Sequence, residues 1–221
     1  PVKVISVTRD RPIHELIVGP GANSPSELRG KSIAVGSLDG TAAVMTRRIL
    51  QAKGLDAQKD VNLLSMDTPA RLQSLLSGRV AGAMMTPPSI YLAEEKGYKV
   101  FGRGRDYMRY LQTGVVSTDS HIKQSREKLL RFLRAWNRGL KAYQESPEVM
   151  VPYIQKRLGV KDAQLARRMY DDDAPFVLNG GRLSADAARE IVEIGREALR
   201  NKEPIPKDKI FVFTLPAEAL K

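Results

Sequence analysis

The chain has 221 residues, of which 42% are hydrophobic, and its 36 Lys and Arg against 25 Asp and Glu give a formal net charge of +11. This apolar content can offset the ordering entropy of folding, which excludes a globally disordered chain. The absence of cysteine excludes disulfides and thiolate sites, and two histidines are too few for a histidine metal cage. No segment approaches the ~20 apolar residues of a membrane span, and Pro1–Val7 lacks the pattern of a signal peptide.

The excess positive charge is concentrated in one part of the chain. Residues 121–170 hold 12 Lys and Arg against 4 Asp and Glu, whereas residues 171–221 hold 8 against 10. Within Ser125–Tyr143, apolar residues recur at helical spacing, and basic residues fill much of the remainder. Because no nucleic-acid-binding motif accompanies this charge, we interpret it as a solvated helix face or a docking surface for an acidic partner, not a nucleic-acid interface.

The first half of the chain predicts alternating strands and helices. Two strands come first, and a single helical turn at Ser24–Lys31 leads into a third. Alternation of this kind predicts parallel strands joined by helical crossovers, with ligands bound outside the carboxyl ends of the strands. The predicted strands are Pro1–Val7, His14–Gly19, Ser32–Val35, Val61–Ser65, Val80–Met85 and Lys99–Phe101, and the helices are Thr41–Lys53, Thr68–Gly78 and Ser89–Lys96.

The second half is mainly helical after about Ser120. A strand-like run precedes it at Leu111–Ser117, and a last strand is predicted at Lys209–Thr214, where it needs a sheet to join. The predicted helices are Ser125–Tyr143, Ser146–Leu158, Asp162–Tyr170 and Ser184–Asn201.

The most distinctive local feature is the turn Gly36–Ala42 between a predicted strand and a predicted helix. Glycines let backbone N–H groups approach a ligand, and the dipole of the following helix favours negative charge. The sequence matches neither the Walker A pattern nor the three-glycine dinucleotide spacing. The alternative is that Gly36 and Gly40 only shape a tight turn and Thr41 only caps its helix, and Asp39 favours this because a carboxylate repels an anion.

Two further positions are candidates for the same ligand crevice. Thr86 follows a predicted strand, and Pro87 and Pro88 would hold it facing the crevice, although an ordinary loop is the alternative. Gln112, beside Tyr110, opens the next strand-like run and could face the crevice, or it could be a plain strand residue.

The other polar candidates carry no predicted chemistry. His14 has no acidic or hydroxyl partner at a fixed spacing, His121 is expected at the surface, and Asp171–Asp173 lacks the spacing of a calcium loop. We interpret the three aspartates as a charge cluster at a helix end. With no nucleophile, base and orienter together and no cofactor fingerprint, the residues predict a non-enzymatic α/β ligand-binding protein without cofactor or metal.

The order of several short segments is typical of a known family. The segments are Ser24–Val35, Gly40–Thr41, Gln51–Leu55, Leu76–Val80, Lys96–Val100 and Phe132–Trp136. Together they resemble the aliphatic-sulfonate, taurine and nitrate solute-binding proteins of ABC transporters, the group that includes the NMT1/THI5-like domain. The resemblance covers nearly all of the chain.

The resemblance implies a type 2 periplasmic-binding-protein fold, in which two α/β lobes joined by two hinge strands close over a small ligand. On that basis, residues 20–112 form a central lobe, and residues 1–19 and 113–221 belong to the other. The strand His14–Gly19 would be the outward crossing and Leu111–Ser117 the return.

The resemblance also implies a binding site and partners. The anion-holding position of the family falls on Gly40, Thr41 and Ala42, with Ser37 nearby, in agreement with the helix-dipole argument. The implied partners are a small anionic solute and an ABC permease in the membrane, and the implied location is periplasmic or otherwise extracytoplasmic. A monomer is expected.

Two departures from the family pattern affect these expectations. Relatives open with a segment that supplies the first strands and helices of one lobe, and its absence here implies an incomplete lobe, either truncated or completed by a partner. Relatives also usually carry an aspartate near Ala81, which leaves the ligand less defined.

Two other classes share this fold. One is the effector-sensing domain of LysR-type regulators, which an upstream helix-turn-helix would indicate. The other is the group of thiamine-precursor synthases, whose cysteine-rich motif and paired histidines are missing here.

Overall fold

The computed structural model describes residues 1–22, 24–199 and 201–220, and it divides the chain into two compact units. Unit 1 consists of Pro1–Pro12 and Arg109–Lys221, and unit 2 is the continuous segment Ile13–Met108. The chain therefore passes between the units at residues 12–13 and 108–109, whereas the resemblance implied boundaries at residues 20 and 112.

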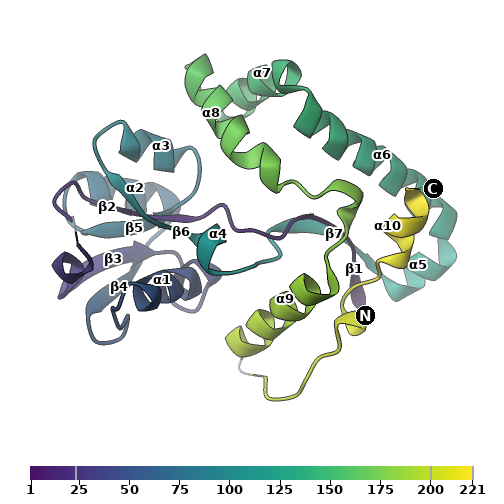
Figure 1. Ribbon diagram of the computed structural model, residues 1–221, viewed down its shortest axis with the longest axis horizontal. Helices are drawn as coiled ribbons and strands as arrows, with labels where there is room; N and C mark the ends of the chain where they lie inside the picture. The colour runs from purple at the N-terminus through teal and green to yellow at the C-terminus, as the bar shows by residue number, and fades with distance from the viewer. Residues whose placement is uncertain (23, 200, 221) are drawn as a thin grey trace. The chain divides into compact units, whose positions relative to one another are not determined.

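Unit 2 is built on a five-stranded sheet with the order β4-β3-β5-β2-β6 (Figure 1). β3 pairs in parallel with β4 and β5, while β2 runs antiparallel to β5 and β6. The predicted parallel alternation therefore holds for every strand except β2, which belongs wholly to this sheet and is not the crossing strand that was expected. The strands are β2 (Glu15–Val18), β3 (Lys31–Val35), β4 (Val61–Ser65), β5 (Gly82–Met85) and β6 (Lys99–Arg103).

The helices of unit 2 follow the punctuation of the sequence. The predicted helical turn is a 3-10 helix, η1, and it begins with a capping box in which the Ser24 N–H donates to Glu27 Oε2 at 2.7 Å. In α1, Met45, Ile49 and Leu50 are buried, as their spacing predicts. The helices are η1 (Pro25–Leu28), α1 (Thr41–Ala52), α2 (Thr68–Leu76), α3 (Ser89–Glu94) and α4 (Gly104–Tyr107).

Unit 1 combines a two-stranded antiparallel sheet with a set of helices. β1 (Val2–Arg9) is buried along most of its length and pairs with β7 (Thr113–Thr118). The α-helices are α5 (Asp119–Gln124), α6 (Arg126–Glu145), α7 (Pro147–Leu158), α8 (Ala163–Asp173), α9 (Ala185–Ala198) and α10 (Thr214–Ala219), and the 3-10 helices are η2 (Ala174–Phe176), η3 (Asn179–Gly181) and η4 (Lys207–Lys209).

The strand predicted at Lys209–Thr214 is wrong. Only one β-bridge forms there, between Val4 and Phe211, with N–H groups of Val4 and Val212 donating across it at 2.8 and 2.9 Å. η4 ends at Lys209 and α10 begins at Thr214, so helical structure takes both ends of the predicted strand. The apolar pattern reflects burial instead, because Phe211 packs in a core cluster with β1.

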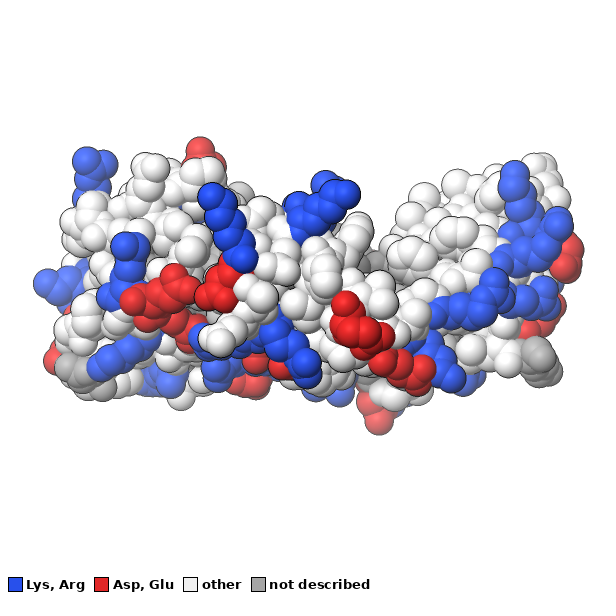
Figure 2. Space-filling view, turned by 90° about the horizontal axis from the view of Figure 1, so that it is seen from above, with Lys and Arg blue, Asp and Glu red and all other residues white. Residues whose placement is uncertain are grey.

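The basic residues of α6 lie on its solvated face, as predicted. Leu129, Leu130, Leu133 and Leu140 are buried, whereas Arg126, Lys128, Arg131, Arg138 and Lys141 are exposed. Figure 2 shows basic side chains over the α6 side of the surface. A docking role for this face stays a prediction. Among the described residues, no helix combines the length and the apolar character needed to cross a bilayer.

Candidate functional site

The sheet of unit 2 contains a topological switch point between β3 and β5. From β3 the chain passes through α1 to β4 on one side, and it then returns through α2 to β5 on the other side. β3 and β5 pair only at Ile33–Gly82 and Ala34–Ala83, so the pairing ends just before both strands finish. Ligands of open α/β sheets bind in the crevice outside the carboxyl ends of the strands at such a point.

The predicted glycine turn leads from β3 into α1 at this crevice. The Gly40 N–H donates to the Ser37 carbonyl at 3.1 Å, and a Cβ on Gly40 would lie 3.2 Å from that oxygen, so Gly40 does shape a tight turn. The turn is tied to β4 by the Ser65 hydroxyl, which donates to the Gly36 carbonyl at 2.6 Å. The N-cap of α1 is Gly40, which has no side chain to cap this helix end, and the helix dipole favours an anion here.

Thr86 and His14 lie at the same edge of the sheet. Thr86 directly follows β5 and is half-buried. The antiparallel register pairs Glu15 with Met85, which puts the preceding His14 next to the end of β5. The structure thus gathers Ser37, Gly40, Thr41, Ala42 and Thr86 at one edge of unit 2.

Gln112 belongs to the other unit. Its N–H donates to the Arg9 carbonyl at 3.1 Å within unit 1. Its part in ligand binding stays a prediction.

Sequence reasoning missed Arg71, which α2 brings to the end of β5. This side chain is 7% exposed, and its guanidinium donates to the Met84 carbonyl at 2.5 Å and to Thr68 Oγ1 at 2.7 Å. Its Nε has no hydrogen-bond partner among the described residues. The available signal was periodicity, because Arg71 lies four residues before the buried Leu75 and so shares its face of the helix.

His14 is electrically neutral beside this arginine. Burial and, to a smaller extent, the positive charge of Arg71 together lower the pKa of His14 to about 4. Its buried Nδ1 has no hydrogen-bond partner in the described part of the chain. At neutral pH, Arg71 therefore carries the side-chain positive charge of this pair alone.

We expect unit 2 to lose stability as the pH falls from about 6.5 to about 4. The unfolded chain binds a proton at His14 near its ordinary pKa of 6.5, whereas the folded chain does so only near about 4. The stabilising difference is present in full above pH 6.5, is lost toward pH 4, and amounts to about 3 kcal/mol. Urea unfolding at a series of pH values measures it. The His14→Asn variant should have a flatter profile between pH 6.5 and 5, and an equal slope in both proteins would contradict this assignment.

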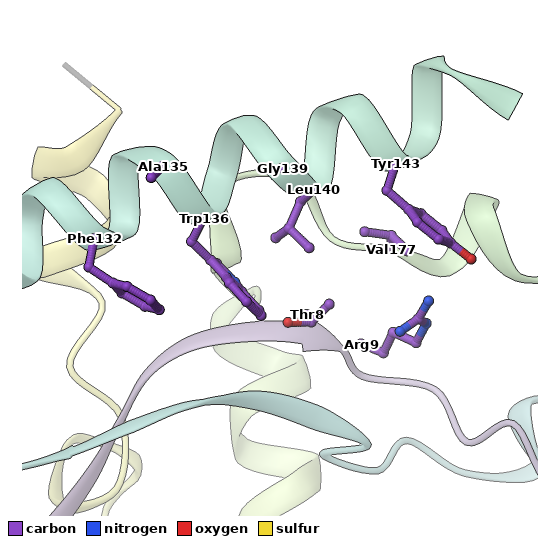
Figure 3. Close-up of a pocket in the computed structure, with 9 residues that line it drawn as sticks. All are labelled: Thr8, Arg9, Phe132, Ala135, Trp136, Gly139, Leu140, Tyr143 and Val177. Atoms are coloured by element: carbon purple, nitrogen blue, oxygen red, sulfur yellow. The ribbon is translucent and has the colours of Figure 1, made fainter. Parts of the chain in front are cut away.

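Unit 1 contains a groove that no sequence pattern predicted (Figure 3). Its volume is about 490 Å³. Phe132 and Trp136 point from α6 toward β1, where Thr8 lies opposite them. The lining is mostly apolar, and the buried Thr8 hydroxyl and Trp136 Nε1 have no hydrogen-bond partner among the described residues.

The charges beside this groove are already compensated. Arg9 forms an ion pair with Asp173, whose Oδ2 also accepts a hydrogen bond from Tyr143 Oη at 2.6 Å. Burial, followed by this hydrogen bond to Asp173, raises the pKa of Tyr143, so the phenol keeps its proton. The groove is thus less suited to an anion than the crevice of unit 2.

The predicted charge cluster at the end of α8 is confirmed. Asp171 pairs with Arg167 at 2.9 Å and Asp172 with Arg168 at 3.9 Å, while Asp173 pairs with Arg9. Within the described ranges, no group of three or more acidic, histidine or cysteine residues is placed to hold a metal ion.

Several solved structures are similar to this chain. A putative periplasmic sulfonate-binding protein SsuA from Methylobacillus flagellatus is 18% identical, with a TM-score of 0.77 over 99% of this chain and 68% of that chain. The alkanesulfonate-binding protein SsuA from Xanthomonas axonopodis pv. citri, bound to MOPS, is 13% identical, with a TM-score of 0.72 over 99% and 73%. A mutant of the enzyme DszB in complex with biphenyl-2-sulfinic acid is 14% identical, with a TM-score of 0.75 over 99% and 79%.

These likenesses confirm the α/β fold of the type 2 periplasmic-binding proteins. No curated protein matches the chain in sequence. The profile of the family described as NMT1/THI5 like matches residues 1–150, which is more than half of the chain. By this match the chain belongs to the NMT1/THI5-like family.

Proposed function

We propose that the protein is a solute-binding protein that captures a small anionic organic or inorganic solute of the sulfonate, taurine or nitrate type for an ABC importer. The observation that carries the proposal is the uncapped N-terminus of α1 at the switch point of the unit 2 sheet. Its open dipole and the turn before it favour a negatively charged group near Thr41 and Ala42. The Gly40 N–H donates within the turn, so it is not available to the ligand.

The structural neighbours support this class of solute. Two of them are a sulfonate-binding and an alkanesulfonate-binding protein. The neighbour DszB is a desulfurization enzyme, so an enzymatic activity is the alternative function. This chain has no cysteine, so it has no thiolate nucleophile, and we favour binding over catalysis.

On this proposal the protein acts in the periplasm or another extracytoplasmic compartment, and its protein partner is an ABC permease. The exposed basic face of α6 is the surface that would meet an acidic patch on such a partner.

The Thr41→Asp variant tests the site. A carboxylate at the first position of α1 should repel the anion and weaken binding at least about tenfold. It should not unfold the helix, because an acidic residue in the first turn is favourable for the helix dipole. Binding is measured by titrating the protein with methanesulfonate and following backbone amide shifts by NMR. The Thr41→Asn variant has nearly the same size without the charge and is the matched control, and unchanged binding by the aspartate variant would refute the placement.

A further inference from the structure

We propose that Arg71 supplies the positive charge that the bound anion neutralises, and that the solute is therefore a monoanion with at least two acceptor oxygens, of the sulfonate or carboxylate type. This inference rests on the proposed function and specifies its ligand.

The guanidinium of Arg71 has only uncharged hydrogen-bond partners among the described residues. Its two hydrogen bonds go to uncharged acceptors, the Met84 carbonyl and the Thr68 hydroxyl, and Nε has none among the described residues. No carboxylate in the described part of the chain forms an ion pair with it. A buried charge that forms no ion pair is unfavourable, because buried charges are normally paired.

The nearest compensation is weak. Asp67 interacts favourably with Arg71, but it is exposed, and its Oδ1 accepts the Ala70 N–H at 2.9 Å as the N-cap of α2. Burial is the larger influence and lowers the pKa of Arg71. Within the described residues, the positive charge of Arg71 is thus only weakly compensated.

The guanidinium of Arg71 lies near the end of β5. Met84, whose carbonyl it contacts, comes one residue after the last β3–β5 pair at Ala34–Ala83. The guanidinium therefore lies where the two strands separate, which is where open α/β sheets bind their ligands. The turn to α1 leaves from β3 on one side of this point, and Thr86 follows β5 on the other.

The charges at this end of the unit 2 sheet limit the charge of the anion. Arg71 contributes one positive charge, the open end of α1 contributes about half a charge, and His14 is neutral at pH 7. The exposed carboxylates of Asp39 and Asp67 stand on the adjoining loops. Arg71 is the one buried charge among these groups, since both carboxylates are exposed to solvent. A single buried positive charge suits a monoanion, whereas a dianion such as sulfate would remain undercompensated. The planar fork of an arginine favours a head group that presents two oxygens.

The test compares two probes and three variants. At constant ionic strength, calorimetry should show that the unaltered protein binds ethanesulfonate at least about tenfold more tightly than sulfate. Arg71→Gln should weaken ethanesulfonate binding at least about thirtyfold, and Arg71→Lys, which keeps the charge without the fork, should recover part of it. Arg79→Gln is the matched control, because Arg79 is exposed and precedes the opposite end of β5, so its loss should leave the affinity unchanged.

The alternative is that Arg71 only supports β5 through the Met84 carbonyl. In that case Arg71→Gln would lower the urea midpoint of unfolding and leave the ethanesulfonate affinity of the folded protein unchanged, which would overturn this inference. Arg71→Lys keeps a donor for the carbonyl and serves as the test if the glutamine variant does not fold. An affinity for sulfate equal to that for ethanesulfonate would overturn the monoanion assignment.

The two proposals fail in different ways. If ethanesulfonate binds the unaltered protein and shifts the amides of Thr41 and Ala42, but Arg71→Gln binds it equally well, only the role of Arg71 is wrong. If the unaltered protein binds neither probe, the proposed function is wrong and the role of Arg71 falls with it.

Discussion

Replacing Gly181 with alanine should destabilise unit 1 by about 3 kcal/mol. Gly181 has a φ of +64°, and a Cβ there would lie 2.2 Å from Ser6 Oγ and 3.1 Å from Ser6 Cβ. Ser6 is fully buried in the middle of β1, so the strand cannot move aside without disturbing its pairing with β7. Trp136 is the single tryptophan of the chain and lies in unit 1, so its fluorescence during urea unfolding reports this change.

Two controls separate the steric clash from the backbone strain. Ser6 Oγ has no hydrogen-bond partner among the described residues, so Ser6→Ala should cost little and should recover about 1–2 kcal/mol in the double variant. Gly139→Ala adds the same methyl group in α6, where nothing lies within 4 Å, and should be neutral or stabilising by up to about 1 kcal/mol. A double variant no more stable than Gly181→Ala would show that the positive φ alone is responsible.

Leu133→Ala should lower the stability of unit 1 by about 2–5 kcal/mol. Leu133 is completely buried on α6, in a cluster that also contains Ile5 of β1 and Leu215 of α10. The truncation leaves a cavity at the point where three elements meet. The expected result is an earlier Trp136 fluorescence transition in urea.

The matched variant for unit 2 is Leu75→Ala. Leu75 is equally buried, but its cluster consists of residues of unit 2. The far-UV circular dichroism transition should move earlier, and the Trp136 transition should move by less. If Leu75→Ala moved both transitions equally, the two units would unfold as one cooperative body and the separate assignment of these cores would be wrong.

Much of the fold could be predicted because its elements are defined locally. Ser24 and Glu27 make a capping box within four residues, and Gly54, Gly78 and Gly97 follow the helices that they were expected to end. The errors arose where long-range packing decided the outcome. The segment Lys209–Thr214 has the composition of a strand, but burial of Phe211 against β1 satisfies it with a single bridge.

The candidate site shows the same contrast between local sequence signals and long-range packing. The turn before Thr41 was visible because glycines and a helix start are neighbours in the sequence. Arg71 was not, since its importance depends on burial and on a carbonyl thirteen residues away in β5. The groove of unit 1 was equally hidden, because Thr8 and Trp136 come from distant parts of the chain.

The double passage of the chain between the units has a consequence for folding order. Unit 2 is one continuous segment, whereas unit 1 joins twelve N-terminal residues to Arg109 and the residues beyond it. Within unit 2, the Gly104 N–H donates to the His14 carbonyl at 2.8 Å, and within unit 1 the Tyr110 N–H donates to the Asp10 carbonyl at 3.0 Å. Once unit 2 has formed, its ends are already close, which removes most of the loop-closure entropy that pairing β1 with β7 would otherwise cost. During synthesis, unit 2 can therefore fold first. Unit 1 then folds around its own N-terminal strand after the later helices emerge.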